Sequence, residues 1–198
     1  MEIYDHIENH AEETLLPYRS FFPNKYLEIN IKSKEIFLES LLGLKLLEDL
    51  LRKTDSSFSL HALRYTVYGK PYFPNQQLFC SLAHSEGMVI ATLSEQPVGI
   101  DLEKQQETSL CPQMLIHSTL LSYAGQTDWL RAWVHQEAVF KLFGWKKLEE
   151  TLSIQWENLY EGSIHRETRQ SFRLLPIEDI PGYYGAKCAF IGQHADYL

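Results

Sequence analysis

Two stretches of the chain carry apolar residues at the spacing of an amphipathic helix. In the first, the apolar residues recur at three- and four-residue steps, which places them on one helix face. The positions are Phe37, Leu41, Leu44, Leu47 and Leu51. Ser33 is a suitable N-cap, and Glu35 in the first turn favours the positive end of the helix dipole. The second helix is predicted to start at Thr127 or Asp128 and to end just before Gly144.

Shorter apolar runs, bounded by turn-forming residues, predict strands. The predicted strands before residue 105 are 63–68, 79–82, 88–93 and 97–102. Residues 152–190 are expected to form several more strands, with turns at Glu161-Gly162 and Pro181-Gly182. We therefore expect an α+β or mixed α/β chain. A division of the chain disturbs the predicted elements least in the turn at 94–97. It gives an N-terminal subdomain (residues 1–95) and a C-terminal subdomain (residues 96–198).

Composition and charge narrow the function classes. The chain has 198 residues, 44% of them hydrophobic, which is enough for one large or two small globular units. Its net charge of −8 argues against binding nucleic acid or an anionic membrane as the main function, because both require a basic surface. Three scattered cysteines (Cys80, Cys111 and Cys188) predict reduced, packed thiols.

The termini and the apolar segments predict a cytoplasmic protein. The first residues lack the basic start and apolar core of a signal peptide. The most apolar stretch, 37–51, contains four charged residues and is shorter than the roughly twenty apolar residues that span a bilayer.

Two carboxylates in the predicted strand 97–102 and its extension suggest a metal site. Side chains alternate along a strand, so Asp101 and Glu103 point to the same side. Two carboxylates on one face repel each other unless a cation lies between them, and Mg²⁺ prefers such oxygen ligands. The alternative is an exposed acidic pair at a strand end.

The second helix adds two charges where they are least expected. Glu137 and Lys141 fall inside its apolar stripe, whereas Arg131, His135 and Gln136 are predicted on its polar side. A buried charge requires a partner. The pair either forms a structural ion pair or borders a cleft that holds a metal and an anion.

Four motifs, taken in order, resemble those of one family. They read Tyr68-Gly69-Lys70-Pro71, Ala83-His84-Ser85, Val98-Gly99-Ile100-Asp101-Leu102-Glu103 and Trp133-Val134-His135-Gln136-Glu137-Ala138-Val139-Phe140-Lys141. This series resembles the phosphopantetheinyl transferases, and most closely the type that activates surfactin synthetase. The resemblance covers residues 33–192.

The resemblance implies a fold, a reaction and partners. The expected fold has two similar α/β subdomains related by a pseudo-twofold axis, so that a monomer suffices. The expected enzyme moves the phosphopantetheine arm of coenzyme A, bound in the cleft between the subdomains, onto a serine of an acyl or peptidyl carrier protein. No nucleic acid or membrane is involved.

The resemblance also implies residue roles. Mg²⁺ would be bound by Asp101, Glu103 and Glu137, and Glu137 would also act as the base. Lys141 would stabilise the leaving phosphate. Contacts to the phosphates of coenzyme A would come from Lys70, His84, Lys141 and, on the first long helix, Lys45.

The chain departs from the family pattern at two positions. Gln136 replaces the usual lysine beside the helix glutamate, which would remove a cation from the site. Ala83 replaces the usual serine before the histidine, which would remove a hydroxyl near a phosphate. These departures suggest the main alternative, a homologue that binds coenzyme A without transferase activity. A hydrolase that uses the same carboxylates is a third possibility. The presence of both Lys70 and His84 in the motif series argues against it, because simple hydrolysis needs no cleft for a coenzyme.

Overall fold

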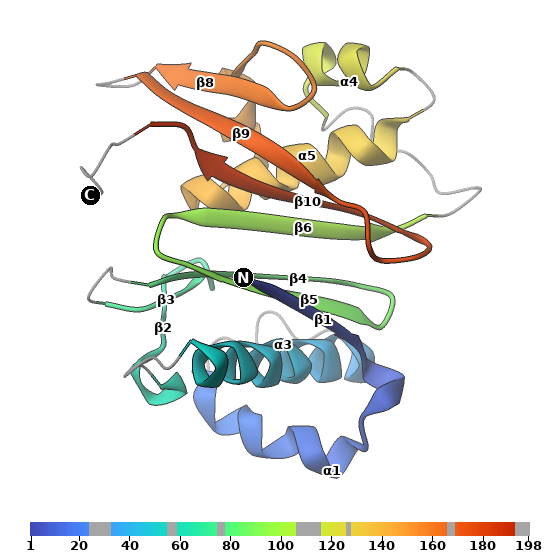
Figure 1. Cartoon of the computed structure of the whole chain (residues 1–198), viewed down its shortest axis with the longest axis vertical. Coiled ribbons are helices and arrows are strands. Elements are labelled where there is room, and N and C mark those ends of the chain that lie inside the picture. Colours follow the sequence, from blue (N-terminus) through green and yellow to red (C-terminus); the bar gives the residue numbers. More distant parts are fainter. Residues whose placement is uncertain are drawn as a thin grey trace.

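The protein consists of helices packed on antiparallel sheets, an α+β arrangement (Figure 1). The computed structural model describes these ranges: 1–23, 33–54, 59–74, 78–105, 116–125, 128–165 and 169–192. Cys111 and Thr127, both named above, lie outside these ranges. Among the described helices, none is long and apolar enough to cross a membrane.

The N-terminal part is a three-stranded sheet with one long helix on it. The sheet has the order β1 (Glu2–His6), β5 (Met88–Ser94), β4 (Phe79–Ser85), and α3 (Lys34–Lys53) packs against it. Ser33 caps α3 as predicted, because its side chain accepts a hydrogen bond from the Ile36 amide at 3.2 Å. The leucines of the apolar stripe are buried in the core between helix and sheet.

Shorter elements complete this part. A brief helix, α1 (Glu12–Leu15), continues into the 3₁₀ helix Leu16–Phe21. The 3₁₀ helix Leu60–Ala62 precedes a small hairpin of β2 (Arg64–Tyr65) and β3 (Pro71–Tyr72). The 3₁₀ helix Ile7–Asn9 follows β1.

The C-terminal part is a five-stranded sheet covered by α5 (Trp129–Phe143). The strand order is β6 (Val98–Lys104), β10 (Tyr183–Phe190), β9 (Arg169–Ile177), β8 (Glu161–His165), β7 (Gln155–Trp156). Two further elements pack against α5, namely α4 (Ser118–Ala124) and the 3₁₀ helix Leu148–Ser153.

The helix α5 approaches β6 very closely, and a glycine permits it. A Cβ atom at Gly99 would collide with the backbone of Ala138 and Leu142. The helix then ends at Gly144, which has the left-handed conformation (φ 64°) that glycine adopts most readily. The close approach brings the Glu137–Lys141 turn of α5 beside Asp101 on β6.

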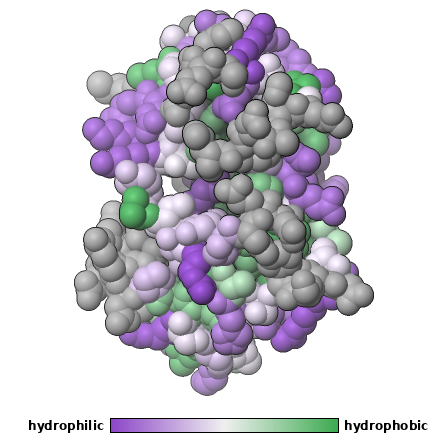
Figure 2. Space-filling view, turned by 90° about the vertical axis from the view of Figure 1, so that its left-hand side faces the viewer, coloured by the Kyte–Doolittle hydropathy of each residue, from purple (hydrophilic) through white to green (hydrophobic). Residues whose placement is uncertain are grey.

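Serine side chains join the two sheets where β4 lies beside β6. The Ser81 hydroxyl accepts a hydrogen bond from the Ile100 amide at 3.1 Å, and the Ser85 hydroxyl accepts one from the Lys104 amide at 3.2 Å. Figure 1 shows β4 and β6 running next to each other at this junction. On the face drawn in Figure 2, the described surface is mainly hydrophilic, with separate hydrophobic patches.

The predicted helices and the strands β5 and β6 are confirmed, but three details are wrong. β4 extends to Ser85, so His84 lies on a strand, and only Glu86 and Gly87, both with positive φ, form the turn. Glu161-Gly162 begins β8 and is not a turn. The strand predicted at 63–68 is limited to two residues. The turn at Pro181-Gly182 is present.

Candidate functional site

Asp101, which is buried, and Lys141, which is partly exposed, form an ion pair between β6 and α5. The Lys141 Nζ lies 2.6 Å from the Asp101 Oδ1, the short distance expected for a charge-assisted hydrogen bond. Burial favours the neutral amine, but the attraction of Asp101 raises the pKa of Lys141 above its usual value. The second Asp101 oxygen, Oδ2, is buried and has no hydrogen-bond partner within the described part of the chain. Such an atom is costly to bury, and a bound ion or an ordered water would supply its missing partner.

Glu103 is oriented by its neighbours. The Ser85 hydroxyl donates a hydrogen bond to the Glu103 Oε2 at 2.7 Å, and the Trp133 side chain donates a second one. Burial, the larger effect, and repulsion from Asp101 raise the pKa of Glu103, while these hydrogen bonds oppose the shift. Ser85 therefore links β4 of the N-terminal part to a proposed metal ligand.

The surroundings of Glu137 raise its pKa. Burial, followed by repulsion from Asp101 and Glu103, raises the pKa of Glu137 to about 7, against the smaller opposing effect of Lys141. This mutual repulsion means that the three carboxylates lie close enough to interact.

The same carboxylates fit a divalent cation by their chemistry. Within the described ranges, no three His, Cys, Asp or Glu side chains form a group that could hold a metal ion as they stand. Yet the unpartnered Asp101 Oδ2 and the mutual repulsion of the carboxylates are both conditions that a cation with oxygen ligands would relieve.

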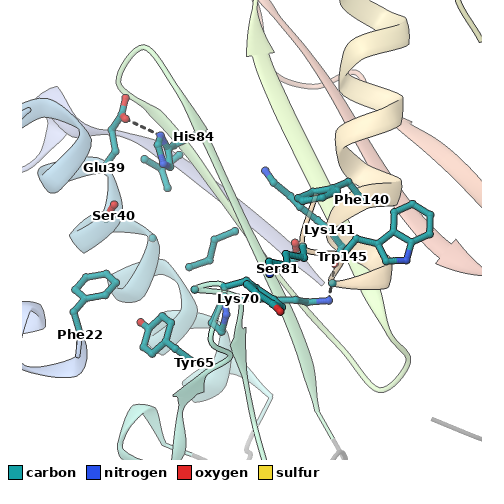
Figure 3. Close-up of a pocket in the computed structure, with 18 residues that line it drawn as sticks. Phe22, Glu39, Ser40, Tyr65, Lys70, Ser81, His84, Phe140, Lys141 and Trp145 are labelled. Atoms are coloured by element: carbon teal, nitrogen blue, oxygen red, sulfur yellow. Dashed lines mark hydrogen bonds and ion pairs between the residues drawn. The ribbon is translucent and has the colours of Figure 1, made fainter. Parts of the chain in front are cut away.

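A cavity of about 260 Å³ lies next to this cluster, between α3, the β2–β3 turn, β4 and the end of α5. Three residues predicted to bind the substrate line it, namely Lys70, His84 and Lys141 (Figure 3). A further cation, Lys146, lies at its edge, with the Lys146 Nζ 5.5 Å from the ring centre of Tyr68. The cavity is also lined by five aromatic side chains: Phe22, Tyr65, Tyr68, Phe140 and Trp145. Its lining is thus cationic and aromatic.

Lys70 connects the two parts of the protein. Its Nζ donates hydrogen bonds to the carbonyl oxygens of Lys141 (2.5 Å) and Leu142 (3.1 Å) in the last turn of α5. A cation at this end of a helix is favourable because the dipole is negative there. Burial lowers the pKa of Lys70 to about 8. The lysine predicted to contact phosphate therefore also caps the helix that carries Lys141.

His84 is held by an acidic residue that the sequence did not single out. Its Nδ1 lies 2.7 Å from the Glu39 Oε2 on α3 (Figure 3). The Gly87 amide donates to the other Glu39 oxygen at 2.6 Å. Burial alone would raise the pKa of Glu39, but the hydrogen bonds from His84 and Gly87 lower it below its usual value. The only feature of the sequence that could have indicated this role is the position of Glu39 among the apolar residues of the first predicted helix.

Lys45 is not placed with the other candidates. It lies on α3, where its Nζ pairs with Asp49 at 2.8 Å, and it does not line the cavity. In the structure, Lys45 belongs to a helix-surface ion pair.

Two residues expected on the polar side of α5 are buried instead. His135 and Gln136 are 2% and 0% exposed, because α5 is covered by α4 and the 3₁₀ helix Leu148–Ser153 as well as by the sheet. The Gln136 Oε1 accepts a hydrogen bond from the His117 amide, which starts α4. A glutamine here therefore replaces no cation in the cavity, contrary to the expectation.

Ala83 also lies away from the cavity. It is buried in a small core cluster with Ile90, Val98 and Ile100, on the β4 face between Ser81 and Ser85. A hydroxyl at this position would meet β6 rather than a phosphate in the cavity.

Comparison with known proteins gives no family assignment. No family model matches the chain, and no curated protein matches it significantly. The family membership stays a prediction from the motifs.

Proposed function

We propose that this protein is a Mg²⁺-dependent phosphopantetheinyl transferase that uses coenzyme A to modify a serine of an acyl or peptidyl carrier protein. One observation carries the proposal: Lys141 belongs both to the carboxylate cluster and to the cationic cavity. The cluster has the groups needed for the reaction, and the cavity has the charge needed for a polyphosphate substrate.

The cavity supports a nucleotide-like substrate. Lys70, Lys141, Lys146 and His84 supply positive charge or hydrogen-bond donors for phosphates. The aromatic walls offer flat surfaces for a planar base. The volume of about 260 Å³ is below that of sites for whole drug-sized ligands, ~300–1,000 Å³. We therefore expect it to hold part of coenzyme A, with the arm extending towards the carboxylates.

The proposed reaction is one displacement at phosphorus. The serine oxygen of the carrier attacks the phosphorus atom that bears the phosphopantetheine arm. Its proton passes, directly or through water, to Glu137, the residue that the family resemblance assigns as the base. The bond to the leaving adenosine 3′,5′-bisphosphate breaks, and Lys141 stabilises the charge that develops on it.

Asp101, Glu103 and Glu137 are the proposed ligands of Mg²⁺. When bound, Mg²⁺ would neutralise negative charge on the pyrophosphate of coenzyme A, which makes the phosphorus atom of the pyrophosphate a better electrophile. Ser85 and Trp133 orient Glu103 for this role.

The architecture agrees with the proposed pseudo-twofold fold in one respect. Each part has an antiparallel sheet with one long helix packed on it, α3 in the first and α5 in the second. The cavity takes lining residues from both parts, which agrees with a substrate cleft between two subdomains.

Mass spectrometry of a carrier protein tests the proposal. The protein is incubated with coenzyme A, Mg²⁺ and an apo carrier, and the carrier should gain the mass of one phosphopantetheine. Coenzyme A binding, measured by calorimetry in parallel, separates the alternatives. Binding without transfer to any carrier of fatty-acid, polyketide or peptide synthesis would favour the inactive homologue, and no binding would refute both.

A further inference from the structure

A second cavity, of about 230 Å³, lies on the C-terminal part away from the proposed transferase site. The first turns of α5, the end of β9 and the start of β10 border it. Its chemically distinctive lining residues are Arg131, His135, Tyr160, Glu178, Tyr183 and Tyr184. None of the residues assigned above to Mg²⁺ or coenzyme A lines this cavity.

His135 offers this cavity a hydrogen-bond acceptor. The residue is only 2% exposed, and its Nδ1 lies 2.8 Å from the Leu159 carbonyl oxygen, so Nδ1 carries the proton. Because Nδ1 donates to this carbonyl, the acceptor lone pair of the ring is on Nε2, and Nε2 has no hydrogen-bond partner in the described part of the chain. A buried ring with one unused polar atom in a cavity wall is typical of a binding site.

Two opposite charges, Arg131 and Glu178, line the same cavity and do not pair with each other. Arg131 lies over the Tyr184 ring, with its Cζ 5.4 Å from the ring centre, and its Nε lies 3.2 Å from Asp128. The outer nitrogens of this guanidinium have no partner among the described residues. Glu178 is exposed and forms no ion pair within the described ranges. The cavity thus presents a guanidinium fork and a carboxylate that do not neutralise each other.

We propose that this cavity binds a free α-amino acid with a large apolar or aromatic side chain. The Arg131 fork would bind the carboxylate, because guanidinium and carboxylate match as paired hydrogen bonds. The ammonium would donate to Glu178 and to the His135 Nε2. The side chain would pack against the rings of Tyr160, Tyr183 and Tyr184.

The charges explain why a free amino acid fits better than other small ligands. A residue inside a peptide has neither the ammonium nor the carboxylate, and a simple organic acid would leave Glu178 unpaired. A zwitterion offers a carboxylate to the outer guanidinium nitrogens, which Asp128 leaves free, and an ammonium to Glu178. The site needs no contribution from the proposed transferase site, so either proposal can fail without the other.

Calorimetry with L-phenylalanine as the probe tests the proposal. Two matched compounds each lack one charged end: 3-phenylpropionate has no ammonium, and 2-phenylethylamine has no carboxylate. We expect L-phenylalanine to bind and each truncated compound to bind at least about tenfold more weakly, the effect of one hydrogen-bonded charge. Absence of binding by both L-phenylalanine and L-leucine up to their solubility limits, or equal affinity for the truncated compounds, would overturn the proposal.

Matched variants place the binding in this cavity. Arg131→Gln and Glu178→Gln should each reduce the affinity for L-phenylalanine at least about tenfold. Arg169→Gln and Glu157→Gln are the controls, because these two residues pair with each other at the surface and do not line the cavity. Binding that survives both cavity variants would refute the assignment.

His135→Asn tests the histidine separately. The asparagine amide can keep the hydrogen bond to the Leu159 carbonyl but lacks an acceptor at the position of Nε2. Weaker binding with an unchanged melting temperature supports the assigned role of Nε2, and unchanged binding contradicts it.

Discussion

Glu39→Ala should destabilise the protein by about 3 kcal/mol and raise the KM for coenzyme A. The Glu39 carboxylate is buried under the β4–β5 turn, where it accepts a hydrogen bond from the Gly87 amide and pairs with His84. Alanine would leave the amide without its partner and would release His84 from its fixed position in the cavity wall.

The magnitude follows from the two contacts. Breaking a buried ion pair by removing one partner costs about 3–5 kcal/mol. The lower end applies here because the His84 side chain is 37% exposed, and water can solvate it. Glu39→Gln can keep the hydrogen bond from the Gly87 amide, so we expect a smaller loss of about 1–2 kcal/mol.

Urea unfolding and steady-state kinetics measure the two effects. Glu35→Ala, an exposed change on the same helix, is the control and should alter stability by less than about 1 kcal/mol, the contribution of a first-turn carboxylate to the helix dipole. The reasoning fails if Glu39→Ala is as stable as this control, or if Glu39→Gln destabilises as much as Glu39→Ala. An unchanged KM in a folded Glu39→Ala protein would show that His84 needs no fixed position.

Three further predictions concern α5 and its surroundings. The folded-state pKa of His135, about 4, is below the usual 6.5, so this residue binds more protons in the unfolded chain between these values; as the pH falls through this window, the free energy of unfolding measured with urea should fall by up to about 3 kcal/mol more in the wild type than in His135→Asn, while the opposite contribution of Glu137, whose pKa is raised to about 7, is common to both proteins. Gln136→Lys, which introduces the lysine usual in the family that the motifs resemble, should destabilise by at least about 3 kcal/mol because it buries an unpaired cation; a variant as stable as the wild type would contradict the buried placement of Gln136. Lys70→Met should lower thermal stability by about 1–2 kcal/mol by uncapping α5, and faster hydrogen exchange in the last turn of α5 should accompany the loss; unchanged exchange there would refute the capping role.

The features predicted correctly from the sequence are those that local residues determine. The Ser33 cap, the leucine stripe of α3 and the Gly144 end of α5 are set by neighbours a few residues away. The grouping of Asp101 and Glu103 on one strand face and of Glu137 and Lys141 on one helix face also follows from local geometry.

The features that the sequence did not reveal depend on contacts between distant segments. The partnership of Glu39 with His84 joins residues on α3 and β4, and the Ser85–Glu103 hydrogen bond joins β4 to β6. The strand β1 was missed because its pairing partner, β5, lies more than eighty residues away.

The error at His135 and Gln136 has a specific physical cause. A helix-face prediction assumes that one side of the helix packs and the other meets water. In this protein α4 and the 3₁₀ helix Leu148–Ser153 cover a second side of α5. Polar side chains on that side are buried and take backbone partners instead of solvent.

The most direct test of the central claim compares carrier modification by the wild-type protein and by Glu137→Gln. Both are incubated with coenzyme A, Mg²⁺ and the same apo carrier, and the mass of the carrier is followed over time. Glu149→Gln, an exposed change after α5, serves as the control. Our account predicts addition of one phosphopantetheine by the wild type and the control, and none by Glu137→Gln, although that variant still folds. Equal rates for wild type and Glu137→Gln would contradict the account.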